Sequence, residues 1–272
     1  AALPEVLPLL LSCLSASEIE VSQCTMAFLH AYVGRLRKLL PSREQLAAHA
    51  DHLQQLLLVM ARKSVHPEDY CFDAEDEAEE AFNSYRREMA TLFKGISRLH
   101  ASLAQLFVRS MLSSTLDSLA SVPWGHVEVS LWLLYQLGEG LPEAAIRDKG
   151  GVFSTMMTSL LASPASAHHH QAVQLLYFEI LVRYYRFFLV QPEYLHTALS
   201  SFLDGRGLRN PNPVVRQRVC YLILRFVKLT LKVATSHFLA AVSTLTLPLA
   251  TPPADEPPGL LPSGISPSPP SP

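Results

Sequence analysis

The chain has 272 residues, of which 49% are hydrophobic, and a mean hydropathy of +0.19. This content is enough for a large buried core and excludes the low-hydrophobicity composition of a disordered protein. The formal net charge of -2 argues against general coating of nucleic acid, which requires a strongly basic balance.

The pattern of cysteines and apolar residues indicates where such a chain is expected to work. The four cysteines are scattered and form no C-x-x-C pair, which predicts neither a zinc site nor a disulfide framework and fits a reducing compartment. No apolar run reaches the roughly 20 residues needed to span a bilayer, and the observed start carries no signal peptide. We therefore expect a soluble intracellular protein that contacts no membrane.

Apolar residues recur at intervals of three and four rather than two, which predicts helices almost throughout. Prolines fall between the expected helices, where a missing N–H and a fixed φ are tolerated. The expected helices are residues 3–14, 18–40, 43–63, 77–99, 101–120, 125–141, 151–163, 168–190, 193–204, 213–233 and 235–246.

Four of these helices share one apolar stripe. The spacing is 44 residues from Val129 to Val173 and 42 from Val173 to Val215, within the roughly 40–47 residues of HEAT and armadillo repeats. A weaker copy begins near Phe82. The stripe is Val21, Thr25, Leu29, Val33; Val129, Leu133, Leu137, Leu141; Val173, Tyr177, Leu181, Tyr185; and Val215, Val219, Ile223, Val227. The sequence thus predicts an all-α superhelix, a solenoid of five to six HEAT-type helical hairpins over residues 1–247.

Two segments depart from the repeat. Residues 68–80 hold eight acidic and no basic side chains, and we interpret the region near 66–80 as an insertion between paired helices. Half of the chain's 20 prolines lie in residues 248–272, which predicts a flexible or polyproline II tail. Residues 183–232 are instead basic, with nine Lys and Arg against two acidic residues, and this asymmetry points to partners of both signs.

Other motifs favour structural interpretations. The three adjacent imidazoles at 168–170 cannot converge on one ion from a helix, so we expect a surface cluster at a helix start and no metal site. The aromatic run at 184–188 is expected in the core because Tyr185 falls on the stripe. The sequence contains no phosphate-binding loop, nucleophile elbow or H-E-x-x-H motif, and we expect no enzyme.

Several stretches together resemble a known family. They are "EAFNSYRREMATLFKGISRL", "HVEVSLWLLYQLGEGLP", "YFEILVRYYRFFLVQPEYL" and, most specifically, "FLDGRGLRNPNPVVRQRVCYLILRFVK". In this order they resemble the middle portion of exportin-T, the tRNA exporter of the importin-β superfamily. The resemblance covers about residues 68–232 and fades over residues 1–67, where only repeat periodicity remains.

The resemblance implies a monomeric shuttling receptor of nucleus and cytoplasm. It would bind tRNA by shape and backbone, cooperate with the GTP form of Ran and meet nuclear pore proteins. It would need no cofactor, because GTP enters only with the partner GTPase.

Four arginines are the candidates for RNA contact, since guanidinium groups suit phosphate and shape recognition. We expect Arg206 and Arg209 to reach outward from a turn, with Arg216 and Arg218 in the first turn of the next helix. For Arg216 the alternative is a ladder with acidic groups of a neighbouring repeat. Arg225 and Lys228 are expected on the solvated face.

The acidic segment supplies the candidates for contact with Ran, namely Asp73, Glu75, Asp76 and Glu77. Its alternative is a solvated insertion, in which Glu79 and Glu80 favour the start of the following helix. Two rival functions stay open for the whole chain. One is a HEAT scaffold that binds only proteins, and the other is a helical domain associated with an enzyme.

Overall fold

The computed structural model describes residues 3–39, 47–72 and 75–246, and every regular element in these residues is helical. The expected proline-rich tail lies outside the described residues. The helices are α1 (Leu3–Leu14), α2 (Ile19–Gln23), α3 (Met26–Leu39), α5 (Ala50–Lys63), α6 (Glu77–Leu99), α7 (Ala101–Asp117), α8 (Trp124–Leu137), α9 (Glu143–Arg147), α10 (Val152–Ala162), α11 (Gln171–Arg183), α12 (Tyr185–Val190), α13 (Leu195–Leu203) and α14 (Pro213–Thr246). Two short 3₁₀ turns, Pro164–Ala167 and Pro192–Tyr194, complete the set.

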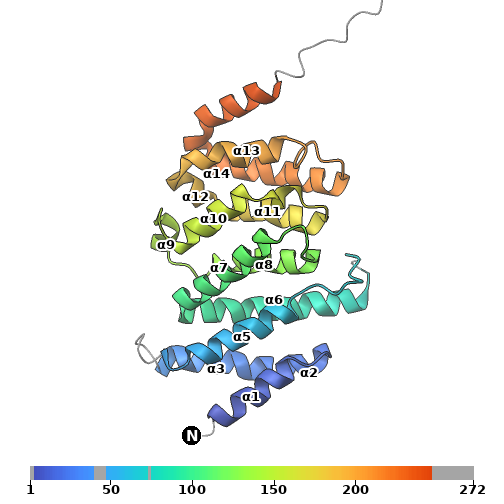
Figure 1. Ribbon diagram of the computed structural model, residues 1–272, viewed down its shortest axis with the longest axis vertical. Helices are drawn as coiled ribbons and strands as arrows, with labels where there is room; N and C mark the ends of the chain where they lie inside the picture. The colour runs from blue at the N-terminus through green and yellow to red at the C-terminus, as the bar shows by residue number, and fades with distance from the viewer. Residues whose placement is uncertain (1–2, 40–46, 73–74, 247–272) are drawn as a thin grey trace, which may run out of the picture.

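The helices stack in chain order along the long axis of the molecule (Figure 1). In the described residues, successive helices along the chain make up five units, here called hairpins: α1 with α2 and α3, α5 with α6, α7 with α8, α10 with α11, and α13 with α14. The second helices pack on one another in series from α3 through α6, α8 and α11 to α14, while α1, α5, α7 and α10 pack in a second layer. Each hairpin thus buries its stripe against its neighbours, and the predicted solenoid is confirmed.

The predicted stripe forms the core between the hairpins. Most of its members are at most 8% exposed, including the weaker copy that begins at Phe82. Leu141, Tyr185 and Val227 are partly exposed. Val21 is exposed by 46%, because the helix expected over residues 18–40 breaks. In its place Ser22 is buried, and its hydroxyl donates to the Leu14 carbonyl, 2.8 Å away, and contacts the Tyr85 hydroxyl.

A second break interrupts the helix expected over residues 168–190. It begins only at Gln171 and ends at Arg183, and α12 starts after Tyr184. The buried Tyr184 ring packs so closely on Gly138 that a Cβ there would lie 2.6 Å from it, and its hydroxyl donates to the Leu134 carbonyl at 2.6 Å. Tyr184 thereby takes the core position that the repeat assigned to Tyr185, which is only half-buried.

Polar side chains also bridge neighbouring hairpins. Arg86 of α6 and Glu128 of α8 form a buried ion pair, and the His66 Nε2 atom lies 2.6 Å from the Arg86 Nη1 atom. Burial favours a higher pKa for Glu128, but the Arg86 guanidinium and His66 outweigh it and hold that pKa below its usual range. The pair therefore fixes α6 against α8 as two charged groups.

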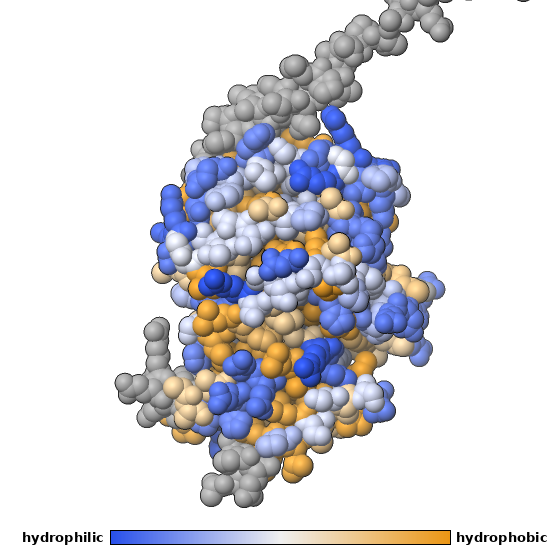
Figure 2. All heavy atoms as spheres, viewed as in Figure 1, coloured by the Kyte–Doolittle hydropathy of each residue, from blue (hydrophilic) through white to orange (hydrophobic). Residues whose placement is uncertain are grey.

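The surface is mixed in character. Figure 2 shows hydrophobic residues gathered over α5 and α7 between hydrophilic ones, and Leu58 and Leu106 are exposed there by 38% and 54%. No helix in the described ranges has both the length and the apolar character that a membrane crossing requires.

Candidate nucleic-acid interface

The most specific stretch of the sequence folds into the turn that joins α13 to α14. Residues 204–212 follow the end of α13 at Leu203 and lead into α14 at Pro213. The Leu208 amide donates to the Phe202 carbonyl at 2.7 Å, which folds the turn back over the end of α13. Gly207 makes this approach possible, because a Cβ at this position would lie 2.2 Å from the Phe202 carbonyl oxygen.

Asparagine side chains hold the rest of the turn. The buried Asn210 donates from Nδ2 to the Arg206 carbonyl at 3.0 Å and accepts the Asn212 amide at 2.9 Å. Asn212 in turn accepts the Val214 amide at 2.9 Å and donates to Gln171 of α11 at 3.0 Å. Local side-chain to backbone bonds of this kind stabilise turns and helix starts. Much of the motif therefore specifies a turn, independently of any ligand.

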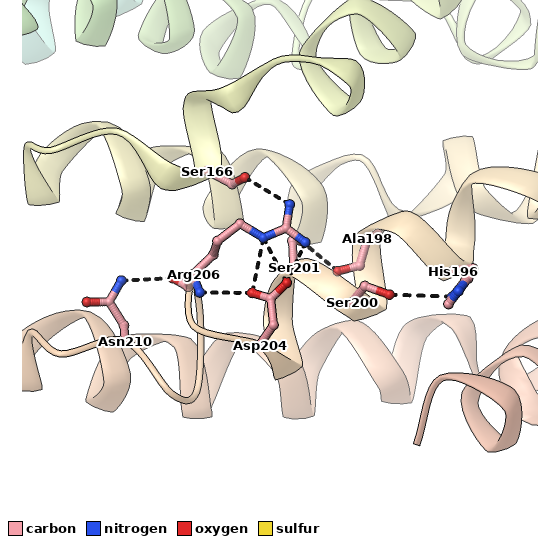
Figure 3. A network of polar contacts seen from close by, with 8 residues as sticks. All are labelled: Ser166, His196, Ala198, Ser200, Ser201, Asp204, Arg206 and Asn210. Atoms are coloured by element: carbon pink, nitrogen blue, oxygen red, sulfur yellow. Dashed lines mark hydrogen bonds and ion pairs between the residues drawn. The ribbon is translucent and has the colours of Figure 1, made fainter. Parts of the chain in front are cut away.

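Arg206 lies inside this network rather than reaching outward as expected (Figure 3). Its Nε atom lies 3.0 and 2.9 Å from the two Asp204 carboxylate oxygens, and its Nη2 atom lies 2.6 Å from Oδ2. Its Nη1 atom also donates to the Ser166 hydroxyl at 3.4 Å. The bond to the Asp204 carboxylate raises the pKa of Arg206 above its ordinary value, so the group stays charged and paired.

The other three candidates have different surroundings. Arg209 is exposed, and its guanidinium makes no hydrogen bond or ion pair within the described part of the chain. Arg216 donates from Nη1 to the carbonyls of Asn210 and Pro211 at 2.7 and 2.8 Å. Arg218 pairs with Glu179 of α11, with its Nε atom 2.9 Å from the carboxylate. The alternative expected for Arg216, an ion pair with an acidic group of a neighbouring repeat, is therefore formed by Arg218 instead.

The structure brings these four arginines to one end of α14, but it gives only Arg209 an uncommitted guanidinium. RNA contact by Arg206, Arg209, Arg216 and Arg218 stays a prediction. Arg225 and Lys228 are exposed on α14, as expected for a solvated face.

The acidic candidates lie between α5 and α6, at the edge of the stack that also carries the turn at residues 204–212 (Figure 1). Asp76 caps α6, with its carboxylate accepting the amides of Ala78 and Glu79 at 2.7 and 3.1 Å. Glu75 and Glu77 are exposed, whereas Asp73 lies outside the described residues. Their contact with Ran stays a prediction, and Asp76 already has a structural role as a helix cap.

An aromatic cluster packs beside this segment. The His170 ring stacks on the Trp124 ring at 3.8 Å between centroids and 8° between planes, and Phe72 contacts both rings. Phe72 has a φ of 63°, which is unfavourable for a bulky residue and is held here by packing against the rings. Periodicity contains no signal for this cluster, because its members come from three separate segments: the turn before α6, the start of α8 and the residue that caps α11.

The histidine run is only partly the expected surface cluster. His169 is exposed, but His168 is 6% exposed, and burial together with the neighbouring His169 and His170 lowers its pKa to about 4. His170 caps α11 by accepting the Ala172 amide at Nδ1. Within the described ranges, no group of His, Cys, Asp and Glu residues has a metal-binding arrangement.

The fold and its surfaces define a class of protein, the helical-repeat solenoids whose extended faces bind other macromolecules. The family model of Exportin-T matches residues 1–247, and the chain belongs to this family. This match extends the resemblance through residues 1–67, where the motifs had indicated only periodicity.

Individual relatives agree with the family match. The chain is 33% identical to Exportin-T of Danio rerio over 227 residues and to Exportin-T of Homo sapiens over 226 residues, in both cases 81% of this chain and 23% of the relative. It is 29% identical to Exportin-T of Arabidopsis thaliana over 233 residues, which cover 84% of the chain and 23% of that protein. The chain therefore spans about a quarter of the length of the relatives that it matches.

Proposed function

We propose that this chain is part of a nuclear export receptor that binds tRNA cooperatively with GTP-bound Ran and carries it from nucleus to cytoplasm. The observation that carries the proposal is the Exportin-T family match over residues 1–247. The receptor acts by binding alone, as a monomer and without a cofactor of its own, and GTP arrives only with Ran. Contacts with nuclear pore proteins during transit belong to the same proposal.

The solenoid supports this proposal physically. Structured RNA is read mainly through phosphates, 2′-hydroxyls and shape, which an extended stack presenting guanidinium groups can match. Arg209 is the member of the predicted RNA-binding set whose guanidinium is exposed and uncommitted. The exposed carboxylates of Glu75 and Glu77 lie on the same edge and offer the opposite charge to a basic protein surface.

The test is a titration of labelled tRNA with the full-length protein, with and without GTP-loaded Ran, at two salt concentrations. We expect affinity that depends on the GTPase and falls steeply with salt, because phosphate contacts release counterions. Weak, salt-insensitive binding that ignores Ran would overturn the proposal. It would favour a HEAT scaffold with protein partners only.

A further inference from the structure

Basic side chains gather along the edge of the stack where one hairpin leads to the next. This basic edge consists of Lys94, Arg98, Arg183, Arg186, Arg225 and Lys228. Figure 1 places α9 and α12 at this edge, opposite the turns at residues 64–76 and 204–212. It is therefore separate from the turn that holds Arg206 and Arg209.

Direct contacts link the helices that carry the basic edge. Glu139 lies between two of them, with its carboxylate 2.8 Å from the Lys94 Nζ atom and 2.7 Å from the Arg183 Nη2 atom. The rings of Phe188 in α12 and Phe226 in α14 are 5.1 Å apart. This contact brings α12, which carries Arg186, beside the part of α14 that carries Arg225.

The edge keeps a positive excess after its own ion pairs are counted. Among the described residues, two carboxylates form ion pairs with it, Glu139 with Lys94 and Arg183 and Glu143 with Arg186, against six basic side chains. Arg98, Arg225 and Lys228 are exposed and pair with no carboxylate among the residues that the structure describes.

The helix macrodipole explains only part of this arrangement. It favours basic residues in the last turn of a helix, as for Arg98 in α6 and Arg183 in α11. Arg225 and Lys228, however, lie well inside α14, and Arg186 is the second residue of α12. The continuity of charge across successive hairpins therefore needs another reason.

A pocket in the middle of the edge has donors suited to a phosphate group. Its volume is about 240 Å³, and it is lined by Gly138, Ile146, Arg183, Tyr184, Tyr185 and Arg186. The Tyr185 hydroxyl accepts the Arg186 Nε–H at 3.3 Å, which leaves its own proton to donate. Guanidinium and phenol donors are common partners of phosphate oxygens in nucleic-acid complexes.

We propose that the basic edge is a track for the phosphodiester backbone of RNA, with one phosphate in the pocket between Arg183 and Arg186. This inference rests on the proposed function and places its RNA contacts on a surface that the sequence motifs did not indicate. RNA fits better than an acidic protein, because the cores of protein interfaces are depleted of charged residues whereas phosphate recognition uses exposed guanidinium groups.

The test compares two double variants of the full-length protein that each remove two exposed positive charges. One is Arg186→Gln with Arg225→Gln on the basic edge, and the matched control is Arg62→Gln with Arg109→Gln on α5 and α7. Labelled tRNA is titrated at several salt concentrations in the presence of GTP-loaded Ran, and thermal unfolding verifies that both variants fold.

We expect the edge variant to lose about tenfold or more in affinity, and the slope of log affinity against log salt to fall by roughly one to two units. The control variant is expected to bind as the parent does. If the parent binds tRNA and the two variants have equal affinities and salt slopes, the proposed track is wrong and the proposed function stays intact. A parent that fails to bind tRNA would overturn both, and loss of Ran binding alone would assign the edge to a protein partner.

Discussion

Arg206 and Arg209 lie three residues apart in one turn, yet their guanidinium groups have different surroundings. The Arg206 side chain is 33% exposed and held by both oxygens of Asp204, whereas Arg209 is exposed without such a partner in the described part of the chain. The sequence places both in the turn, but it contains no signal for which of them is committed to the fold. The difference depends on the fold of the turn, which brings the Asp204 carboxylate within hydrogen-bonding distance of the Arg206 guanidinium.

This difference predicts opposite outcomes for two alanine substitutions. Arg206→Ala should lower the free energy of unfolding by about 1 kcal/mol, since a bidentate but partly exposed ion pair is lost. Arg209→Ala should leave stability unchanged within about 0.5 kcal/mol. Urea unfolding followed by circular dichroism measures both, and equal midpoints for the two variants would contradict the assignment.

His168 should make stability depend on pH. Its pKa is about 4 in the folded chain, mainly because of burial, whereas an unfolded histidine titrates near 6.5. The unfolded state therefore binds more protons between these values, and stability present above pH 6.5 is lost as the pH falls towards 4. In His168→Asn the melting temperature should fall less between pH 7 and pH 5 than in the parent. If the melting temperatures of the parent and of the variant fall equally between pH 7 and pH 5, His168 does not contribute to the pH dependence of stability.

At the scale of elements, the turn between α13 and α14 contains two glycines, and the close approach of its backbone to α13 requires only one of them. Gly207 lies against the Phe202 carbonyl, while a Cβ at Gly205 would meet nothing within 4 Å. Gly207→Ala should therefore cost about 1–3 kcal/mol through overpacking. Gly205→Ala should be neutral or slightly stabilising, because it restricts the unfolded chain. Thermal unfolding of the pair decides the point, and a Gly207→Ala variant as stable as Gly205→Ala would be the contrary result.

Helix breaks show where local pattern stops being informative. Residues 18–40 and 168–190 carry helical periodicity throughout, and the sequence predicted one helix in each. The chain breaks near Cys24 and at Tyr184 because Ser22 and Tyr184 contact groups on other helices, the Tyr85 hydroxyl of α6 and the Leu134 carbonyl of α8. Such partners are distant in sequence, so periodicity alone could not reveal either break.

At the scale of the whole molecule, ion pairs join neighbouring hairpins at two depths. Arg86 and Glu128 are buried between α6 and α8, whereas Glu139 is 42% exposed where it meets Lys94 and Arg183. Glu128→Ala should destabilise the chain by about 3–5 kcal/mol, because it leaves the Arg86 charge buried without its carboxylate. Glu139→Ala should cost about 1 kcal/mol or less. Chemical unfolding measures the loss of stability in both variants. Similar losses would contradict the prediction that the buried pair contributes more than the exposed one.

By itself, the sequence determined the class of fold, the repeat period, most stripe residues of the core and the family, because these depend on local periodicity and on motifs contiguous in the chain. Only the tertiary structure decided which arginines are committed, that His168 is buried, and that basic residues from α6, α11, α12 and α14 share one edge. The Asp204–Arg206 pair is set by the local fold of the turn. The Arg218–Glu179 pair, the burial of His168 and the shared edge depend instead on residues far apart in the chain, which stacking of the hairpins brings together.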